Sequence, residues 1–135
     1  MSYNFMVVDD SSTTRTIIKT ILGMSGLDIG EIIEAENGAD ALSKMEDAWV
    51  DLVFADINMP QMNGVEMVKK MSESGMLKTV PVVIVSSDGS ETRMEELLSE
   101  GVRAYLRKPF SPESIKEITE KILGGGKNAD DSKQA

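Results

Sequence analysis

Short apolar segments that run directly into charged residues most constrain what this chain can fold into. Residues 5–8 run into Asp9 and Asp10, and residues 52–55 run into Asp56. Apolar runs of this length, rich in Val and Phe, are typical of strands buried on both faces. In a parallel sheet they deliver the residues that follow them to one edge, where open α/β sheets bind ligands. The sequence therefore predicts an acidic crevice at the carboxyl edge of a parallel sheet.

Helical patterns alternate with the expected strands. The strands are expected over residues 4–8, 31–35, 50–55, 82–85 and 104–106. The helices are expected over residues 11–24, 38–47 and 91–100, and in two segments capped by Asn63 and Ser111. Five strand–helix units in succession imply right-handed crossovers and helices on both faces of the sheet, which is an α/β fold.

Apolar residues at helical spacing predict the buried helix faces. In the first helix, the pairs expected to be buried are Ile17–Ile21 and Ile18–Leu22. In the fourth helix, the residues expected to be buried are Met94, Leu97 and Leu98.

Composition excludes several classes of site. The 135 residues suit one domain with one core, which we assign to residues 1–123. Because the chain has no Cys and no His, it can form neither disulfides nor thiolate or imidazole metal sites, and it has no Ser-His-Asp triad. The Gly-rich, polar segment 124–135 has no apolar surface to offset the entropy of ordering, so we expect a disordered tail.

Charge and hydropathy bear on partners and location. A net charge of −9 argues against direct nucleic-acid binding, which usually requires a basic surface. No apolar stretch approaches the roughly 20 residues that span a bilayer, so no membrane insertion is expected. Residues 1–4 lack the features of a secretory signal, so we expect a cytoplasmic location. We also expect the chain to be a monomer.

The predicted crevice combines carboxylates with a hydroxyl and an ammonium group. Asp9, Asp10 and Asp56 would repel one another unless a cation neutralises them, and oxygen ligands favour Mg2+, with Mn2+ or Ca2+ behind it. Asp56 is also a candidate nucleophile that could form an acyl phosphate. Ser86 ends the fourth strand and Lys108 follows the fifth, so both could contact phosphate oxygens. For each residue alone, a structural role in a turn or at a helix start is the alternative.

Four separated motifs together resemble the signature of response-regulator receiver domains. They are Val8-Asp9-Asp10, Asp56-x-x-Met59-Pro60-x-Met62-x-Gly64, Val85-Ser86 and Lys108-Pro109-Phe110. The resemblance runs from about Asn4 to Leu123. Tyr105, three residues before the lysine, makes the chain most similar to the stand-alone receivers of chemotaxis. The resemblance, rather than the residue pattern, implies a doubly wound, flavodoxin-like (βα)5 fold with strand order 2-1-3-4-5.

The resemblance also implies a metal-dependent phosphoryl acceptor. Asp56 would accept the phosphoryl group. Mg2+, or Mn2+ in its place, would be held by Asp9, Asp10, Asp56 and the backbone carbonyl of Asn58.

Three further residues would form a switch, again by resemblance. Lys108 would bind the phosphoryl group beside a cis Lys108–Pro109 peptide bond. Ser86 would move to the phosphate on activation, and Tyr105 would then rotate from an exposed to a buried position.

The implied partners are other proteins. Since the chain has no His, the donor would be a phosphohistidine on a separate histidine kinase, or a small acyl phosphate. A flagellar motor component or a phosphatase would read the modified protein, which would catalyse only its own phosphorylation and dephosphorylation. Three alternatives stay open: a receiver in another phosphorelay, a receiver that serves as an unphosphorylated scaffold, and an aspartyl-phosphate phosphohydrolase. The last usually has Asp-x-Asp after the first strand, where this chain has Asp9-Asp10-Ser11.

Overall fold

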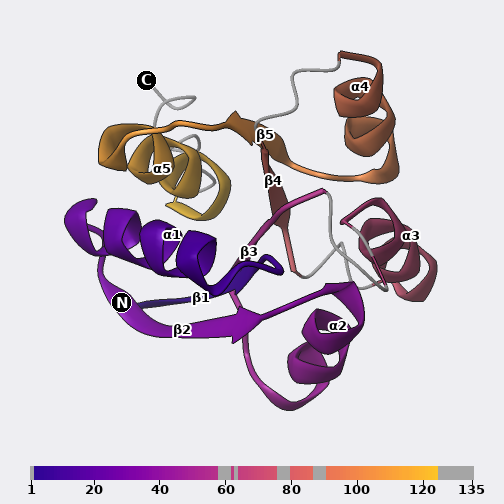
Figure 1. Cartoon of the computed structure of the whole chain (residues 1–135), viewed down its shortest axis with the longest axis horizontal. Helices are drawn as coiled ribbons and strands as arrows, with labels where there is room; N and C mark the ends of the chain where they lie inside the picture. The colour runs from indigo at the N-terminus through magenta and orange to yellow at the C-terminus, as the bar shows by residue number, and fades with distance from the viewer. Residues whose placement is uncertain (1, 58–61, 63, 76–79, 87–90, 125–135) are drawn as a thin grey trace, which may run out of the picture.

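A five-stranded parallel sheet lies between two layers of helices in the computed structural model of the chain (Figure 1), which describes residues 2–57, 62, 64–75, 80–86 and 91–124. The strands are β1 (Tyr3–Val8), β2 (Ile29–Ala35), β3 (Leu52–Ala55), β4 (Val82–Ser86) and β5 (Ala104–Arg107). Their order is β2-β1-β3-β4-β5, and every pair is parallel. The predicted fold class and strand order are therefore confirmed.

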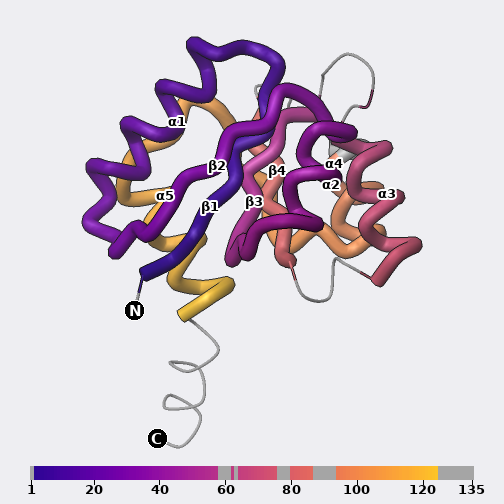
Figure 2. The backbone as a smooth tube through the Cα atoms, turned by 90° about the horizontal axis from the view of Figure 1, so that it is seen from below, coloured from indigo at the N-terminus to yellow at the C-terminus, as the bar shows by residue number. Residues whose placement is uncertain are grey.

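Five α-helices connect and cover the strands. They are α1 (Ser12–Met24), α2 (Gly38–Asp47), α3 (Gly64–Ser74), α4 (Glu91–Glu100) and α5 (Pro112–Thr119), which continues as a π-helical turn, η2 (Glu120–Gly124). Figures 1 and 2 show α1 and α5 on one face of the sheet and α2, α3 and α4 on the other. Among the helices that the structure describes, none combines the length and hydrophobicity needed to cross a bilayer.

Side-chain caps fix where the helices begin. Ser11 Oγ accepts a hydrogen bond from the Thr14 N–H at 3.2 Å, and Asn37 Oδ1 accepts one from the Asp40 N–H at 2.8 Å. Since these caps lie only a few residues after β1 and β2, both helices start beside the carboxyl edge of the sheet. The expected cap at Ser111 is also present, whereas the one at Asn63 lies outside the described residues.

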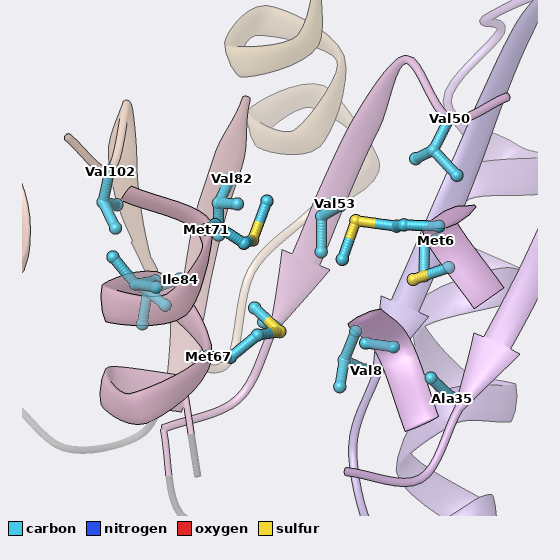
Figure 3. Packing of buried hydrophobic residues seen from close by; sticks show 14 of the residues in the cluster. Met6, Val8, Ala35, Val50, Val53, Met67, Met71, Val82, Ile84 and Val102 are labelled. Atoms are coloured by element: carbon cyan, nitrogen blue, oxygen red, sulfur yellow. The ribbon is translucent and has the colours of Figure 1, made fainter. Parts of the chain in front are cut away.

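Successive residues of each strand point to opposite faces, so each strand contributes to two cores. Figure 3 shows the larger core on the α2–α4 side, which includes Met6, Val53, Ile84, Met67 and Met71. The core under α1 and α5 includes Phe5, Phe54, Leu22 and Ile115. Packing on both faces accounts for the uninterrupted apolar runs of the strands.

Two residues that were predicted to be buried, Ile17 and Leu98, are exposed, so these two predictions are wrong. Ile17 is 52% exposed and Leu98 is 46% exposed, whereas their neighbours Ile18 and Leu97 are buried. Adjacent helical residues point about 100° apart, so only one of each pair lies at the centre of the buried stripe.

Strands β2 and β3 also begin two residues away from the expected positions. Residues 125–135 of the expected tail lie outside the described residues.

Candidate metal centre at the carboxyl edge of the sheet

The ends of two adjacent strands bring three carboxylates together. Val8 of β1 pairs with Ala55 of β3, and the Asp56 N–H donates to the Val8 carbonyl at 2.9 Å. One carboxylate oxygen from each of Asp9, Asp10 and Asp56 lies within 4.8 Å of the others. We call these three residues the acidic cluster. The predicted gathering of acids far apart in sequence is therefore present.

Asp9 is the most deeply buried member of the acidic cluster. Its Oδ1 accepts a hydrogen bond from the Ser11 N–H at 2.9 Å. Its Oδ2 is buried without a hydrogen-bond partner among the described residues, and lies 3.6 Å from Lys108 Nζ. Burial raises the pKa of the Asp9 carboxyl, and the Ser11 N–H and Lys108 only partly oppose that shift. A buried carboxylate oxygen without a donor is a good ligand for a cation.

Asp56 is half-buried at the end of β3. Its Oδ1 accepts a hydrogen bond from the Ile57 N–H at 2.9 Å. Burial is the main cause that raises its pKa; Lys108 lowers the pKa, and the charge of Asp9 raises it further. For both acids, the effect of burial on the pKa outweighs the opposing effect of Lys108, so the ionised carboxylates are disfavoured at this site.

The backbone of Asp56 packs closely against the start of α3. The Gly64 N–H donates to the Ile57 carbonyl at 2.8 Å. A Cβ atom on Gly64 would lie 2.5 Å from the Asp56 carbonyl oxygen, well inside van der Waals contact. Only glycine allows this approach without a shift, which gives a physical reason for the glycine that ends the Asp56 motif.

Ser86 and Lys108 reach the same edge from β4 and β5. Ser86 is buried at the end of β4, and the Lys108 N–H donates to its carbonyl at 2.9 Å. The Lys108–Pro109 peptide bond is cis, as expected. Lys108 Nζ lies beside Asp9, so the structure brings the predicted ammonium to the acidic cluster.

Of the two remaining predicted residues, Tyr105 and Asn58, the structure describes only Tyr105. Tyr105 pairs with Ile84 in the sheet and is half-buried against the core on the α2–α4 side. Asn58, whose carbonyl is the expected fourth metal ligand, lies outside the described residues.

Arg15 contacts the site directly and Glu34 contacts it through Arg15, and neither residue was predicted from the sequence. Arg15 Nη1 donates to the Asp9 carbonyl oxygen at 2.6 Å, and Arg15 Nε donates to Glu34 Oε1 at 2.8 Å. The available signals were weak: Arg15 lies one turn after the cap Ser11, and Glu34 lies at the end of the second strand. Neither signal alone identifies a pair 19 positions apart.

Comparisons with known proteins agree with this geometry. The family model described as response regulator receiver domain matches residues 5–120. Over 124 residues the chain is 42% identical to a chemotaxis protein CheY homolog of Campylobacter jejuni, covering 90% of this chain and 92% of that protein.

Solved structures of chemotaxis proteins are also similar. The CheY4 structure from Vibrio cholerae has a TM-score of 0.79 and 29% identity, covering 91% of this chain and 100% of that one. A CheX–CheY–BeF3–Mg2+ complex from Borrelia burgdorferi has a TM-score of 0.78 and 25% identity, covering 89% of this chain and 88% of that one.

Proposed function

Because this chain belongs to the response-regulator receiver family, we propose that it is a signalling switch in which Asp56 accepts a phosphoryl group from a histidine kinase. The observation that carries the proposal is the half-buried Asp56 carboxylate within an acidic cluster that Lys108 faces. Its relatives named above are chemotaxis proteins, which favours signalling over the phosphohydrolase alternative.

The acidic cluster fits a hard divalent cation. Its donors are all carboxylate oxygens, and Oδ2 of Asp9, which pairs with Lys108 but accepts no hydrogen bond from the described residues, offers a ligand to the cation. We propose that Asp9, Asp10 and Asp56 hold Mg2+, with the Asn58 carbonyl as a further ligand; Mn2+ suits the same donors. When bound, the cation offsets the negative charge of the carboxylates and of the incoming phosphoryl oxygens.

Asp56 supplies the nucleophile in this proposal. The Ile57 N–H holds its Oδ1, so we assign Oδ2 as the oxygen that bonds to phosphorus. The P–N bond of the donor phosphohistidine breaks as the O–P bond forms, and its electron pair leaves with the imidazole. The Lys108 ammonium contacts a phosphoryl oxygen as a point charge.

Two further residues transmit the modification. The phosphoryl group adds roughly 1.5 to 2 negative charges to the crevice, which would draw the Ser86 hydroxyl toward it. Movement of Ser86 would open space for the ring of Tyr105, which lies one strand away on β5. A local charge would thereby bias a two-state surface around α4, β5 and α5.

The proposed setting is cytoplasmic chemotaxis. The relatives support this pathway by their names, and the Borrelia burgdorferi CheY was crystallised with CheX. We propose that a separate protein, such as a flagellar motor component or a phosphatase, reads the phosphorylated form, without direct contact to nucleic acid. Residues 1–123 remain our proposed domain boundary.

Radiolabelled acetyl phosphate, supplied with MgCl2, tests the acceptor. We expect labelling at Asp56, identified by borohydride reduction and mass spectrometry, and loss of labelling with EDTA or in Asp56→Asn. Asp51→Asn is the matched control, because Asp51 lies at the other end of β3 and should not affect labelling. Undiminished labelling of Asp56→Asn would show that the acceptor is a different residue.

A further inference from the structure

A second group of charged residues contacts the acidic cluster at the Asp9 backbone carbonyl. Arg15 and Lys19 of α1 both contact the Glu34 carboxylate of β2, at 2.8 and 2.9 Å. Lys44 of α2 donates to the Glu34 backbone carbonyl at 2.6 Å. We call these four residues the paired network. It joins two helices to the strand that lies next to β1.

Arg15 is the member of the paired network that reaches the acidic cluster. One guanidinium nitrogen donates to the Asp9 carbonyl and another to Glu34, and the side chain is only 15% exposed. A guanidinium group is planar and rigid, so two bonds from different nitrogens fix its orientation. Glu34 therefore sets the position from which Arg15 holds the Asp9 carbonyl.

The Asp9 carbonyl belongs to the peptide that leads into Asp10. The Asp9 N–H donates to the Ala35 carbonyl at 3.0 Å, and its side chain is held by the Ser11 N–H. With Arg15 on the carbonyl, every polar group of Asp9 except Oδ2 has a partner among the described residues. This arrangement fixes the direction of Asp10 and leaves Oδ2 facing the crevice.

Glu34 also controls the charge behind the site. An isolated guanidinium next to the acidic cluster would compete electrostatically with a divalent cation. The hydrogen bonds from Arg15 and Lys19 lower the pKa of Glu34, so it is ionised at neutral pH and offsets that charge.

We propose that Arg15 and Glu34 are positioning residues for the divalent cation: Glu34 orients Arg15, and Arg15 fixes the Asp9–Asp10 peptide so that both carboxylates can bind. The inference rests on the proposed function, because it assumes that the acidic cluster holds Mg2+. Neither residue touches the cation itself.

Amide NMR spectra recorded during titration with MgCl2 alone test this inference. Arg15→Gln should weaken Mg2+ binding about 10-fold, the low end for partners that orient metal ligands. Glu34→Gln should weaken it about 3-fold, since Arg15 keeps one of its two bonds. The double variant should match Arg15→Gln, because Glu34 acts through Arg15. Lys19→Gln, which removes only the outer contact to Glu34, should bind within about 2-fold of wild type.

Arg15→Lys separates position from charge. Lysine keeps the positive charge but cannot make both bonds, so this variant should bind Mg2+ as weakly as Arg15→Gln. Wild-type affinity in Arg15→Gln, or equal weakening in Lys19→Gln, would overturn the inference. If Arg15→Gln does not fold, wild-type affinity in Glu34→Gln overturns it instead. If wild type binds MgCl2 and the variants bind it equally well, only this inference fails. If wild type itself does not bind MgCl2, the proposed function fails.

Discussion

The acidic cluster and the paired network meet at Asp9, where Arg15 contacts the backbone carbonyl, yet the pKa values of their carboxyl groups shift in opposite directions. Burial raises the pKa of Asp56 in the acidic cluster, whereas hydrogen bonds from Arg15 and Lys19 lower the pKa of Glu34 in the paired network. A carboxylate whose counter-charges come from its own chain stabilises the fold. In the acidic cluster, Lys108 faces three carboxylates and compensates their charge only in part, so a cation from outside would stabilise them, and this marks the cluster as the ligand site.

The largest expected effect comes from the close packing of Gly64 against the backbone of the acidic cluster. Gly64→Ala should lower the free energy of unfolding by about 2 to 3 kcal/mol, because the added Cβ would push on the Asp56 carbonyl. Gly23→Ala is the matched control: Gly23 lies in α1, where a Cβ meets nothing within 4 Å. That change should raise the unfolding free energy by about 1 kcal/mol. Urea unfolding measures both, and an unchanged midpoint for Gly64→Ala would contradict the packing argument.

Removing one charge from the acidic cluster should stabilise the metal-free protein. Asp56→Asn keeps an acceptor for the Ile57 N–H but eliminates one of the three negative charges. We expect a gain of about 1 to 2 kcal/mol in unfolding free energy with EDTA present, comparable to the cost of a buried polar group that lacks its partner. Lower stability than wild type would mean that the carboxylates are already compensated.

Adding Mg2+ should narrow or reverse the difference in unfolding free energy between Asp56→Asn and wild type. At a concentration about ten times its dissociation constant, a cation that binds only the folded state stabilises wild type by about 1.4 kcal/mol. Asp56→Asn should gain less, since it lacks one of the proposed carboxylate ligands. Unfolding curves with and without MgCl2 test this, and an equal gain in both proteins would remove Asp56 from the ligand set.

The acidic cluster could be predicted because each strand end is a local feature of the sequence, and one general rule of parallel sheets brings those ends together. An apolar run fixes where a strand ends, and parallel pairing brings Asp9 and Asp56 to the same edge. The prediction that both Ile17 and Ile18 are buried failed for Ile17, because the exposure of each residue depends on how α1 is rotated against the sheet. That rotation is decided by packing rather than by the periodicity of one helix.

The contacts of the paired network could not be predicted from the sequence, because they also depend on how separate elements pack together. Arg15 and Glu34 meet only because α1 crosses back over β1 toward β2, and charged residues at such spacing are usually separate surface groups. Their contact depends on the register in which Glu34 lies opposite Val7. The acids of the site can be identified from the end of each strand separately. The contact between Arg15 and Glu34 can be identified only from the assembled sheet and helices.

The smallest expected effect concerns Glu34. Without metal, the pH dependence of folding stability should have opposite signs for Glu34 of the paired network and Asp56 of the acidic cluster. The pKa of Glu34 is lowered in the folded state, so its contribution to stability is present above its ordinary pKa of 4.5 and is lost as the pH falls through the folded-state value. Glu34→Gln should therefore be less stable than wild type at pH 7, by about 0.5 kcal/mol, because its side chain is 36% exposed and solvent screens the ion pairs. The difference should vanish in acid.

Asp56→Asn should be more stable than wild type at neutral pH, and its unfolding free energy should approach that of wild type as the pH falls. The pKa of Asp56 is raised, so its ionised form destabilises the fold above the folded-state pKa, and that penalty disappears as the pH falls toward 3.8. Urea unfolding across this pH range should give one variant below wild type and one above, converging at low pH. Convergence from the same side would mean that the two regions do not differ in charge balance, and that uncompensated charge does not mark the metal site.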